Sequence, residues 1–400
     1  MNKENPRGMR PSLPEPTPDA RAASAALCAM IATDIAAAGG WIPFARYMEL
    51  ALYAPGLGYY SGGARKFGAA GDFITAPELT PLFAQTVAAQ ALQIMAGSAA
   101  RILEVGAGSG VMAAELLREL ERRGDLPERY LILELSGELR ARQQATLAQR
   151  VPHLLERVTW IDTLPHRFSG LVLGNEVLDA MPVGLVEWRD TQGAASGAPE
   201  ILERGVILGG QGGFAWAERP AQGALLHAAQ SLSIAAPYVS EIGLAASAWI
   251  AEWGRILEHG ALLLFDYGFP RHEYYHPQRG SGTLMCHYRH HAHNDPLWWP
   301  GLNDITAHVD FTAIAEAGFE AGLEVIGYTS QAQFLFNCGF TETLGRLSNN
   351  SDRASVAETR NAGKLISPNE MGELFKVVAL GRGIREPLLG FSRNDRRHAL

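Results

Sequence analysis

The feature that most constrains this chain is the segment Arg101 to Gly110, in which an apolar strand (RILEV) ends in a turn with three alternating glycines (GAGSG). Glycine accepts positive φ and carries no Cβ, so the backbone can turn tightly there and approach a bound molecule closely. Residues 111–120 (VMAAELLREL) then have the apolar spacing of a helix. A strand, a glycine turn and a helix in this order predict an α/β fold whose parallel sheet holds a ligand at the carboxyl end of its first strand.

The spacing of the glycines separates two classes of cofactor. A dinucleotide site needs G-x-G-x-x-G, and the place of its third glycine is occupied here by Val111, which disfavours a nicotinamide-linked oxidoreductase. The remaining pattern, Glu104-x-Gly106-x-Gly108-x-Gly110, is typical of S-adenosyl-L-methionine (SAM) sites. We predict that these four residues bind SAM. The alternative is a tight connection without a ligand.

Two further strands end in an acidic residue. Residues 130–133 (YLIL) lead into Glu134, where a carboxylate is placed to accept hydrogen bonds from both ribose hydroxyls. Residues 158–161 (VTWI) lead into Asp162, which we predict to accept the adenine amino group, with a solvated loop acid as the alternative.

A fourth strand, residues 170–173 (GLVL), leads into a polar turn that contains Asn175, Glu176 and Asp179. Two acids and an amide therefore gather where the reacting group is expected. Upstream, the glycine-rich loop that includes Asp72, Phe73 and Thr75 is a candidate lid over the cofactor. An ordinary surface connection is the alternative for this loop.

Changes in composition along the chain predict one main domain with additions. A fifth strand, residues 261–268, and a last strand, residues 374–380, complete the expected sheet, and short β runs between glycine turns predict inserted antiparallel strands. The expected organisation is a disordered tail (1–20), a helical N-terminal region with the lid loop (21–100), a methyltransferase domain (101–383) with a β insertion (183–218) and a loop insertion (269–304), and a tail (384–400).

The composition indicates which classes of partner the protein can bind and in which cellular compartment it is expected. With 34 basic and 42 acidic residues the net charge is −8, which argues against nucleic-acid binding, because phosphate neutralisation needs concentrated Lys and Arg. The three cysteines are far apart, without a disulfide framework or a cysteine zinc site. The first twenty residues are polar and Pro-rich and do not resemble a signal peptide, and the Ala-rich stretch 22–38 is read as a packed helix too short to span a bilayer. We therefore expect a cytoplasmic protein.

Residues 286–295 (CHYRHHAHND) are rich in histidine, a common metal ligand. The stretch lies in a long connection without a partner motif, and methyl transfer from SAM needs no metal. We predict no metal site, and we interpret these histidines as packing in a loop on the substrate side.

Several separated motifs, taken in order, resemble those of the MidA family of SAM-dependent methyltransferases. They are Phe44-Ala45-Arg46-Tyr47-Met48, Gly58-Tyr59-Tyr60, residues 71–78 (GDFITAPE), the turn from Glu104 to Gly110, Asn175-Glu176 through Asp179-Ala180-Met181-Pro182, Asp266-Tyr267-Gly268 and His308-Val309-Asp310-Phe311. The resemblance covers roughly residues 40–380. It implies a class I (Rossmann-like) methyltransferase sheet with a helical N-terminal addition and an inserted β excursion. It also implies SAM as the cofactor and a protein substrate, an arginine of a respiratory-complex subunit.

Methyl transfer from a sulfonium is an in-line displacement, so the protein chiefly aligns the reactants and excludes water. If the acceptor is a guanidinium, carboxylates must hold it and take up its proton. Glu176 is our first candidate for this role and Asp179 the second, with Asp266 or Tyr267 in support. Asn175 and Glu176 are also expected to contact the cofactor. For Asp179, capping of a following helix or turn is the alternative.

Two functional hypotheses remain at this stage. The first is an active methyltransferase that modifies a protein arginine. The second is an assembly or interaction protein that keeps a SAM-binding fold with little catalysis. The sequence leaves open whether the chain is a monomer or a homodimer.

Overall fold

Eight strands form the main sheet of the computed structural model, which describes residues 13–62, 74–191, 199–348 and 354–400. Seven of them follow the order β15-β16-β10-β5-β2-β3-β4 across the sheet, and the short strand β14 (Val309–Asp310) pairs with β10. β16 runs antiparallel to both of its neighbours, while β10, β5, β2, β3 and β4 pair in parallel. The strands are β2 (Arg101–Val105), β3 (Arg129–Leu133), β4 (Val158–Ile161), β5 (Phe168–Asn175), β10 (Leu257–Phe269), β15 (Glu324–Ser330) and β16 (Phe375–Arg382). The expected class I sheet with a final antiparallel strand is confirmed.

Helices bury both faces of this sheet, as is usual for parallel strands. Successive residues of β5 alternate between the two apolar cores: Leu171 and Leu173 belong to one, and Val172 belongs to the other. The first core includes residues from α4 (Leu82–Ala96), α5 (Val111–Arg123), α6 (Gly137–Arg150), α11 (Gln331–Asn337), α12 (Phe340–Ser348) and α13 (Ala354–Ile366). The second includes residues from α8 (Leu244–Ile256) and α10 (Phe311–Glu320).

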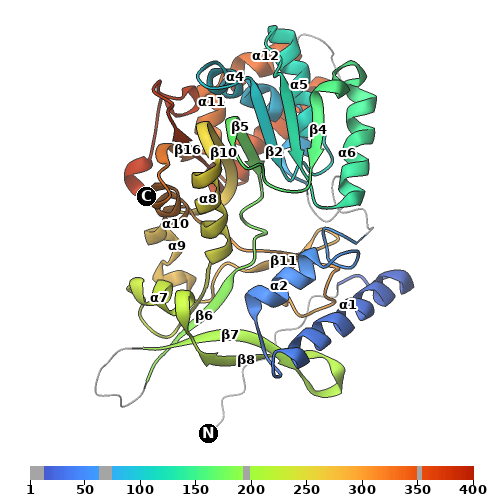
Figure 1. Cartoon of the computed structure of the whole chain (residues 1–400), viewed down its shortest axis with the longest axis vertical. Helices are drawn as coiled ribbons and strands as arrows, with labels where there is room; N and C mark the ends of the chain where they lie inside the picture. Colours follow the sequence, from blue (N-terminus) through green and yellow to red (C-terminus); the bar gives the residue numbers. More distant parts are fainter. Residues whose placement is uncertain (1–12, 63–73, 192–198, 349–353) are drawn as a thin grey trace.

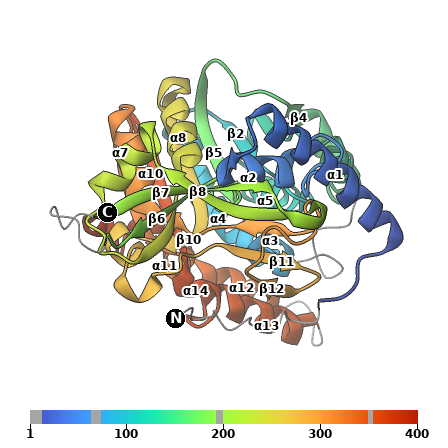
Figure 2. The same cartoon turned by 90° about the horizontal axis from the view of Figure 1, so that it is seen from below.

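A second, smaller sheet lies below the main one in Figure 1 and nearest the viewer in Figure 2. Its order is β1-β7-β6-β9, and β8 pairs with β7. The strands are β1 (Ile42–Pro43), β6 (Gly184–Arg189), β7 (Glu200–Leu208), β8 (Phe214–Pro220) and β9 (Tyr238–Ile242). β6, β7 and β8 are antiparallel, as the glycine-punctuated β runs predicted. The insertion reaches past residue 218, because α7 (Gly223–Ser231) and β9 complete it.

The N-terminal helices pack against this smaller sheet. Buried residues of α1 (Pro18–Ala37) and α2 (Phe44–Tyr53) share one apolar core with Val206 of β7. The short helix α3 (Ala76–Leu79) leads into α4. Five 3-10 helices lie among the described residues: η1 (Pro152–Arg157), η2 (Gly210–Gly212), η3 (Pro277–Arg279), η4 (Leu389–Phe391) and η5 (Arg397–Ala399).

Residues 269–304 contain more structure than the expected loop. They contain α9 (Arg271–Tyr274), β11 (Met285–Tyr288), β12 (His291–His293) and the start of β13 (Asp304–Thr306). The strand β14 (Val309–Asp310) follows, and the short helix α14 (Met371–Leu374) comes later in the chain. The three strands form a sheet in the order β12-β11-β13. Each is only three or four residues long, so period-two alternation is too brief to mark it in the sequence.

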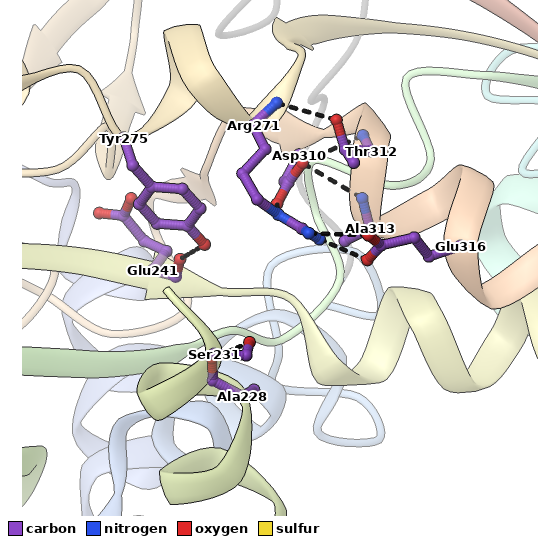
Figure 3. A network of polar contacts seen from close by, with 9 residues as sticks. All are labelled: Ala228, Ser231, Glu241, Arg271, Tyr275, Asp310, Thr312, Ala313 and Glu316. Carbon is purple, nitrogen blue, oxygen red and sulfur yellow. Dashed lines mark hydrogen bonds and ion pairs between the residues drawn. The ribbon is translucent and has the colours of Figure 1, made fainter. Parts of the chain in front are cut away.

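Hydrogen bonds and ion pairs connect the start of this insertion to α10, beside the main sheet, and to β9 of the smaller sheet (Figure 3). The guanidinium of Arg271 donates to Glu316 of α10 (Nη1 to Oε1, 2.8 Å) and to Asp310 (Nε to Oδ2, 3.3 Å). The hydroxyl of Tyr275 donates to the backbone carbonyl of Glu241 in β9 (3.1 Å). The insertion is therefore held between the main sheet's helix layer and the smaller sheet.

The N-terminal expectation differs from the structure in one respect. α1 begins at Pro18, inside the segment expected as a tail, because Thr17 caps it by accepting a hydrogen bond from the N–H of Ala20 (3.3 Å). By length and composition alone, this 20-residue helix could cross a membrane, so the expectation that it is too short is wrong. Its buried side chains, among them Leu27 and Ile31, pack in the core shared with α2. The absence of a membrane span stays a prediction.

The C-terminal residues 384–400 also differ from the expected tail. Leu388 and Phe391 are buried in the first core, and the N–H of Gly390 donates to the side chain of Gln90 in α4 (2.8 Å). Two isolated apolar residues produce no periodic pattern, which is why the sequence predicts a tail here.

Candidate functional site

One cavity of about 830 Å³ opens at the carboxyl ends of β2, β3, β5 and β10. This is the edge at which open α/β sheets bind ligands. The glycine turn, the start of α6 and the turn after β5 line one part of it. Segments outside the class I sheet line the rest: Tyr53, Tyr60 and Ser61 from the N-terminal region, and Thr283, Met285, His287, Asp304 and Thr306 from the later insertion.

All three glycines of the turn have positive φ, at 64° for Gly106, 52° for Gly108 and 81° for Gly110. Gly106 and Gly108 line the cavity. Gly110 does not line it in this structure. A Cβ on Gly110 would lie 3.0 Å from the Cα of Gln143 in α6, so this glycine allows two helices to approach.

The two predicted acids at the ends of β2 and β3 are buried at the cavity wall. Glu104 accepts a hydrogen bond from the hydroxyl of Tyr130 (2.6 Å), and burial raises its pKa to about 7. Glu134 accepts from the N–H of Ser136 (2.9 Å) and from the amide of Gln143 (2.8 Å), and burial raises its pKa as well. Both carboxylates are therefore held in one orientation beside the glycine turn.

Gln143 is a residue of this region that the sequence analysis missed. Its Nε2 donates to Glu134 and to the carbonyl of Gly108 (3.1 Å), and its Oε1 accepts from the indole of Trp160 (3.0 Å). Gln143 thus connects three parts of the site: the glycine turn, Glu134 at the end of β3, and the strand β4. It lies in the middle of a mostly polar helix, where the sequence offers no motif to mark it.

The remaining cofactor predictions fall in different places. Asp162 is exposed and does not line the cavity; it directly follows β4, which is the edge strand of the main sheet. Thr75 lines the cavity at the start of α3. Asp72 and Phe73, the other lid residues, lie outside the described residues.

The turn after β5 is shaped by one buried carboxylate. Oδ2 of Asp266 accepts hydrogen bonds from three successive backbone N–H groups, those of Val177 (3.1 Å), Leu178 (2.8 Å) and Asp179 (3.3 Å). Oδ1 accepts from the N–H of Tyr267 (2.9 Å). Asp266 is 1% exposed and does not line the cavity, and its predicted catalytic role stays a prediction. Its pKa is raised by burial and by the charges of neighbouring acids, against the effect of these N–H donors.

Glu176 is held at this turn with a φ of 55°, which is unusual for a residue with a side chain. Its N–H donates to the carbonyl of Phe265 (2.8 Å), and its Oε1 accepts from the amide of Asn175 (3.1 Å). Glu176 is partly buried and lines the cavity. Burial, followed by the nearby charge of Asp179, raises its pKa to about 8.

Asp179 completes the acidic group at the cavity floor. Its Oδ2 accepts from the hydroxyl of Tyr267 (2.5 Å), and its Oδ1 is buried with no hydrogen-bond partner among the described residues. Burial raises the pKa of Asp179 to about 6. A buried oxygen left without a donor is costly, so this one is a candidate contact for a ligand that carries N–H groups.

Aromatic rings surround these acids. Tyr53 and Tyr60 stack with ring centroids 5.5 Å apart, and the ring of His308 meets that of Tyr267 edge-on at 5.2 Å. Burial and the nearby cations Arg279 and Lys376 lower the pKa of His308 to about 4, so its imidazole is neutral at pH 7. Of these four residues, only Tyr267 was given a role by the sequence, as a support for the two acids.

The electrostatic character of the cavity follows from its lining. Six acids line it, and among the described lining residues none is Lys or Arg. The acids are Glu78, Glu104, Glu134, Glu176, Asp179 and Asp304. A low-dielectric cavity with this lining attracts cations and repels phosphates and carboxylates.

The histidine-rich stretch contributes His287 to the cavity, whereas His293 is buried and bonded to Oδ1 of Asn303 (3.0 Å). Over the part of the chain that the structure describes, no group of three or more His, Cys, Asp or Glu side chains is arranged to hold a metal ion.

Comparison with known proteins gives three related findings. Residues 82–329 match the sequence model of a family described as "Putative S-adenosyl-L-methionine-dependent methyltransferase". A solved structure from Burkholderia thailandensis, bound to S-adenosyl-homocysteine, is 51% identical, with a TM-score of 0.92 over 97% of this chain and 100% of that one. Among curated proteins, the protein arginine methyltransferase NDUFAF7 homolog of Drosophila melanogaster is 27% identical over 88% of this chain and 86% of its own length. NDUFAF7 of Danio rerio is 29% identical over 86% and 84%.

These comparisons correct one expectation. Both curated relatives are named as mitochondrial proteins, which contradicts the cytoplasmic location expected from composition. That expectation used cysteine content and the polar start of the chain, and neither feature separates one reducing compartment from another.

Proposed function

The chain belongs to the family of SAM-dependent methyltransferases matched by residues 82–329, and from this premise we propose that it transfers the methyl group of SAM to the guanidinium of an arginine in a protein substrate. Membership bears out the resemblance inferred from the separated motifs. Arginine as the acceptor is supported by the curated relatives, which are named protein arginine methyltransferases. A respiratory-complex subunit, implied by the family resemblance, is the substrate we propose.

The acidic lining of the cavity is the observation that carries this proposal. SAM brings a sulfonium cation, and an arginine side chain brings a guanidinium that stays charged at any pH a protein tolerates. A cavity with six acids and no described Lys or Arg accommodates both charges. A nucleic-acid phosphate or a carboxylate acceptor would meet repulsion there instead.

Glu176 and Asp179 are the residues we propose to hold the guanidinium. Both line the cavity, and Oδ1 of Asp179 lacks a partner among the described residues, so a guanidinium N–H can satisfy it. Carboxylates bind guanidinium through strong, often paired hydrogen bonds, which would fix one nitrogen toward the methyl group. Asp266 and Tyr267 act through these acids, the first by shaping the turn and the second by bonding Asp179.

The proposed step balances charge and protons. The bond between sulfur and methyl breaks as a bond between guanidinium nitrogen and methyl forms, and the sulfonium becomes a thioether. The nitrogen must also lose a proton, and we assign its uptake to Glu176. Burial raises the pKa of Glu176 to about 8, and a cation that binds beside it lowers this pKa, so the bound state holds an ionised carboxylate ready to accept that proton.

For the cofactor, we propose that Gly106, Gly108, Glu104 and Glu134 bind SAM, with Asn175 and Thr75 nearby. The first four line the part of the cavity built on β2 and β3, next to the glycine turn. Positive φ at the two glycines lets the main chain lie against the ligand without a Cβ between them. The fixed carboxylates are the acceptors available to ligand hydroxyl and ammonium groups.

The test is transfer of isotope-labelled methyl from SAM to a pool of peptides with a fixed central arginine and randomised flanks. The wild-type chain should label the pool, and a matched pool with lysine in place of arginine should stay unlabelled. Glu176→Gln should reduce labelling at least a hundredfold while S-adenosyl-homocysteine binding, measured by calorimetry, changes by less than about threefold. If the wild type binds S-adenosyl-homocysteine but labels no arginine peptide, an assembly protein with little catalysis replaces this proposal.

A further inference from the structure

Asp304 is a buried carboxylate at the cavity that comes from outside the class I sheet. It starts β13, is 3% exposed and lines the cavity. The hydroxyl of Tyr60 donates to its Oδ1 (2.7 Å), and the Tyr60 ring in turn stacks on Tyr53. Tyr53 is itself fixed, because its hydroxyl donates to the carbonyl of Ala180 (2.9 Å). A chain of contacts thus orients Asp304 at the cavity wall.

The strand that carries Asp304 is also held in place. β13 pairs with β11, and Glu241 of β9 accepts the backbone N–H groups of Thr283 and Leu284 just before β11 (3.0 Å each). Glu241 is 1% exposed. The three-stranded sheet is therefore anchored to the smaller sheet at the point where it meets the cavity.

Asp304 and Glu176 act on the same space. The negative charge of Asp304 is one of the causes that raise the pKa of Glu176, and it also raises the pKa of Tyr53 and of Tyr60. Carboxylates from two separate parts of the chain therefore face one region, in which no Lys or Arg is found among the described lining residues.

A guanidinium has five N–H donors in one plane, more than Glu176 and the open oxygen of Asp179 can satisfy from one side. We propose that Asp304, oriented by Tyr60, is a further guanidinium-binding residue, so that the acceptor is held between the turn after β5 and the inserted strand β13. This inference rests on the proposed function. A carboxylate offers about four acceptor positions, so protein donors such as the Tyr60 hydroxyl and N–H groups of a ligand can share it.

On this proposal, different segments of the chain bind the cofactor and select the acceptor. The class I sheet supplies the cofactor end of the cavity together with Glu176 and Asp179. Selection of a charged acceptor then depends also on the N-terminal region, through Tyr60, and on the later insertion, through Asp304. A neutral acceptor of the same shape, such as the urea group of citrulline, would bind without needing the charge of Asp304.

Equilibrium dialysis with S-adenosyl-homocysteine present tests this, with two peptide pools that differ only in a central arginine or citrulline. Asp304→Asn removes the charge but keeps an oxygen for the Tyr60 hydroxyl, and Asp125→Asn, at an exposed acid away from the cavity, is its control. Tyr60→Phe removes the orienting hydroxyl. Its control is Tyr47→Phe, which removes a hydroxyl bond of the same length (to the carbonyl of Pro296, 2.7 Å) outside the cavity lining.

We expect Asp304→Asn to weaken binding of the arginine pool by about tenfold or more and of the citrulline pool by less than about twofold. Tyr60→Phe should weaken the arginine pool by about threefold to tenfold. Both controls should match the wild type, and all four variants should bind S-adenosyl-homocysteine as the wild type does.

The inference is overturned if Asp304→Asn keeps its affinity for the arginine pool, or loses both pools equally, since a merely structural role would not depend on ligand charge. A different result tests the premise. If the wild type does not prefer arginine to citrulline, the arginine acceptor itself is wrong, whatever the variants do.

Discussion

Replacing Glu176 by Gln should stabilise the folded chain at alkaline pH. Burial holds the pKa of Glu176 at about 8 in the folded chain, against 4.5 for an unperturbed glutamate. The folded state therefore binds this proton more tightly than the unfolded state does. The contribution of Glu176 to stability is greatest below pH 4.5 and is lost progressively as pH rises toward 8.

The magnitude follows from the same two values. A rise from 4.5 to about 8 corresponds to about 5 kcal/mol of unfolding free energy at full ionisation, which is an upper limit because water in the cavity can relax around the charge. Gln is neutral at every pH and avoids this cost. We expect Glu176→Gln to exceed the wild type by about 2–5 kcal/mol at pH 9 and to approach it at pH 5.

Urea unfolding followed by tryptophan fluorescence, at one-unit steps from pH 5 to pH 9, measures the difference. Glu128→Gln is the matched control, because Glu128 is exposed and outside the cavity lining, and its difference from the wild type should stay constant with pH. A constant difference for Glu176→Gln as well would mean that Glu176 ionises as freely as in water. The buried acidic site inferred here would then be refuted.

Three further outcomes are expected. The ratio kcat/KM for an arginine peptide should rise with pH and level off above about 8, because the free enzyme must ionise Glu176 to bind a cation; a flat profile would contradict this. Tyr267→Phe should raise the pKa of Asp179 by removing a hydrogen bond to its charged form, which makes kcat/KM fall at neutral pH without changing S-adenosyl-homocysteine affinity in calorimetry. Gly106→Ala and Gly124→Ala each place a side chain at positive φ, so each should lower the free energy of unfolding in urea by about 1–2 kcal/mol. Only Gly106→Ala should weaken S-adenosyl-homocysteine binding, because Gly124 follows α5 outside the cavity lining.

The class I sheet could be predicted from the sequence because its strands are short apolar runs that end in glycines or acids. The turn at Gly106 and Gly108 and the acids Glu104 and Glu134 all lie at the cavity, since parallel strands bring their carboxyl ends to one edge. Asp162 follows the same rule along the chain but comes after the edge strand of the sheet and does not line the cavity.

The acceptor side could be predicted only in part. Glu176 and Asp179 follow a strand directly, whereas Asp304 and Tyr60 reach the cavity through tertiary contacts among inserted segments. Asp266 shows a different limit: it lies within the predicted fifth strand and was expected to take part in the chemistry, but its two oxygens accept four backbone N–H groups, which the sequence does not reveal. The spacing of residues along the sequence can place a carboxyl group at the edge of the sheet, but it does not reveal which hydrogen-bond donors that carboxyl group accepts from.

The most direct test of arginine methylation is to map the methyl group itself. The chain is incubated with isotope-labelled SAM and a lysate from cells that lack it, and labelled peptides are sequenced by mass spectrometry, with Glu176→Gln in parallel. The account predicts label on arginine side chains of one or a few proteins, present with the wild type and absent with the variant. Label on lysine, carboxyl or hydroxyl side chains, with every arginine unlabelled, would contradict it.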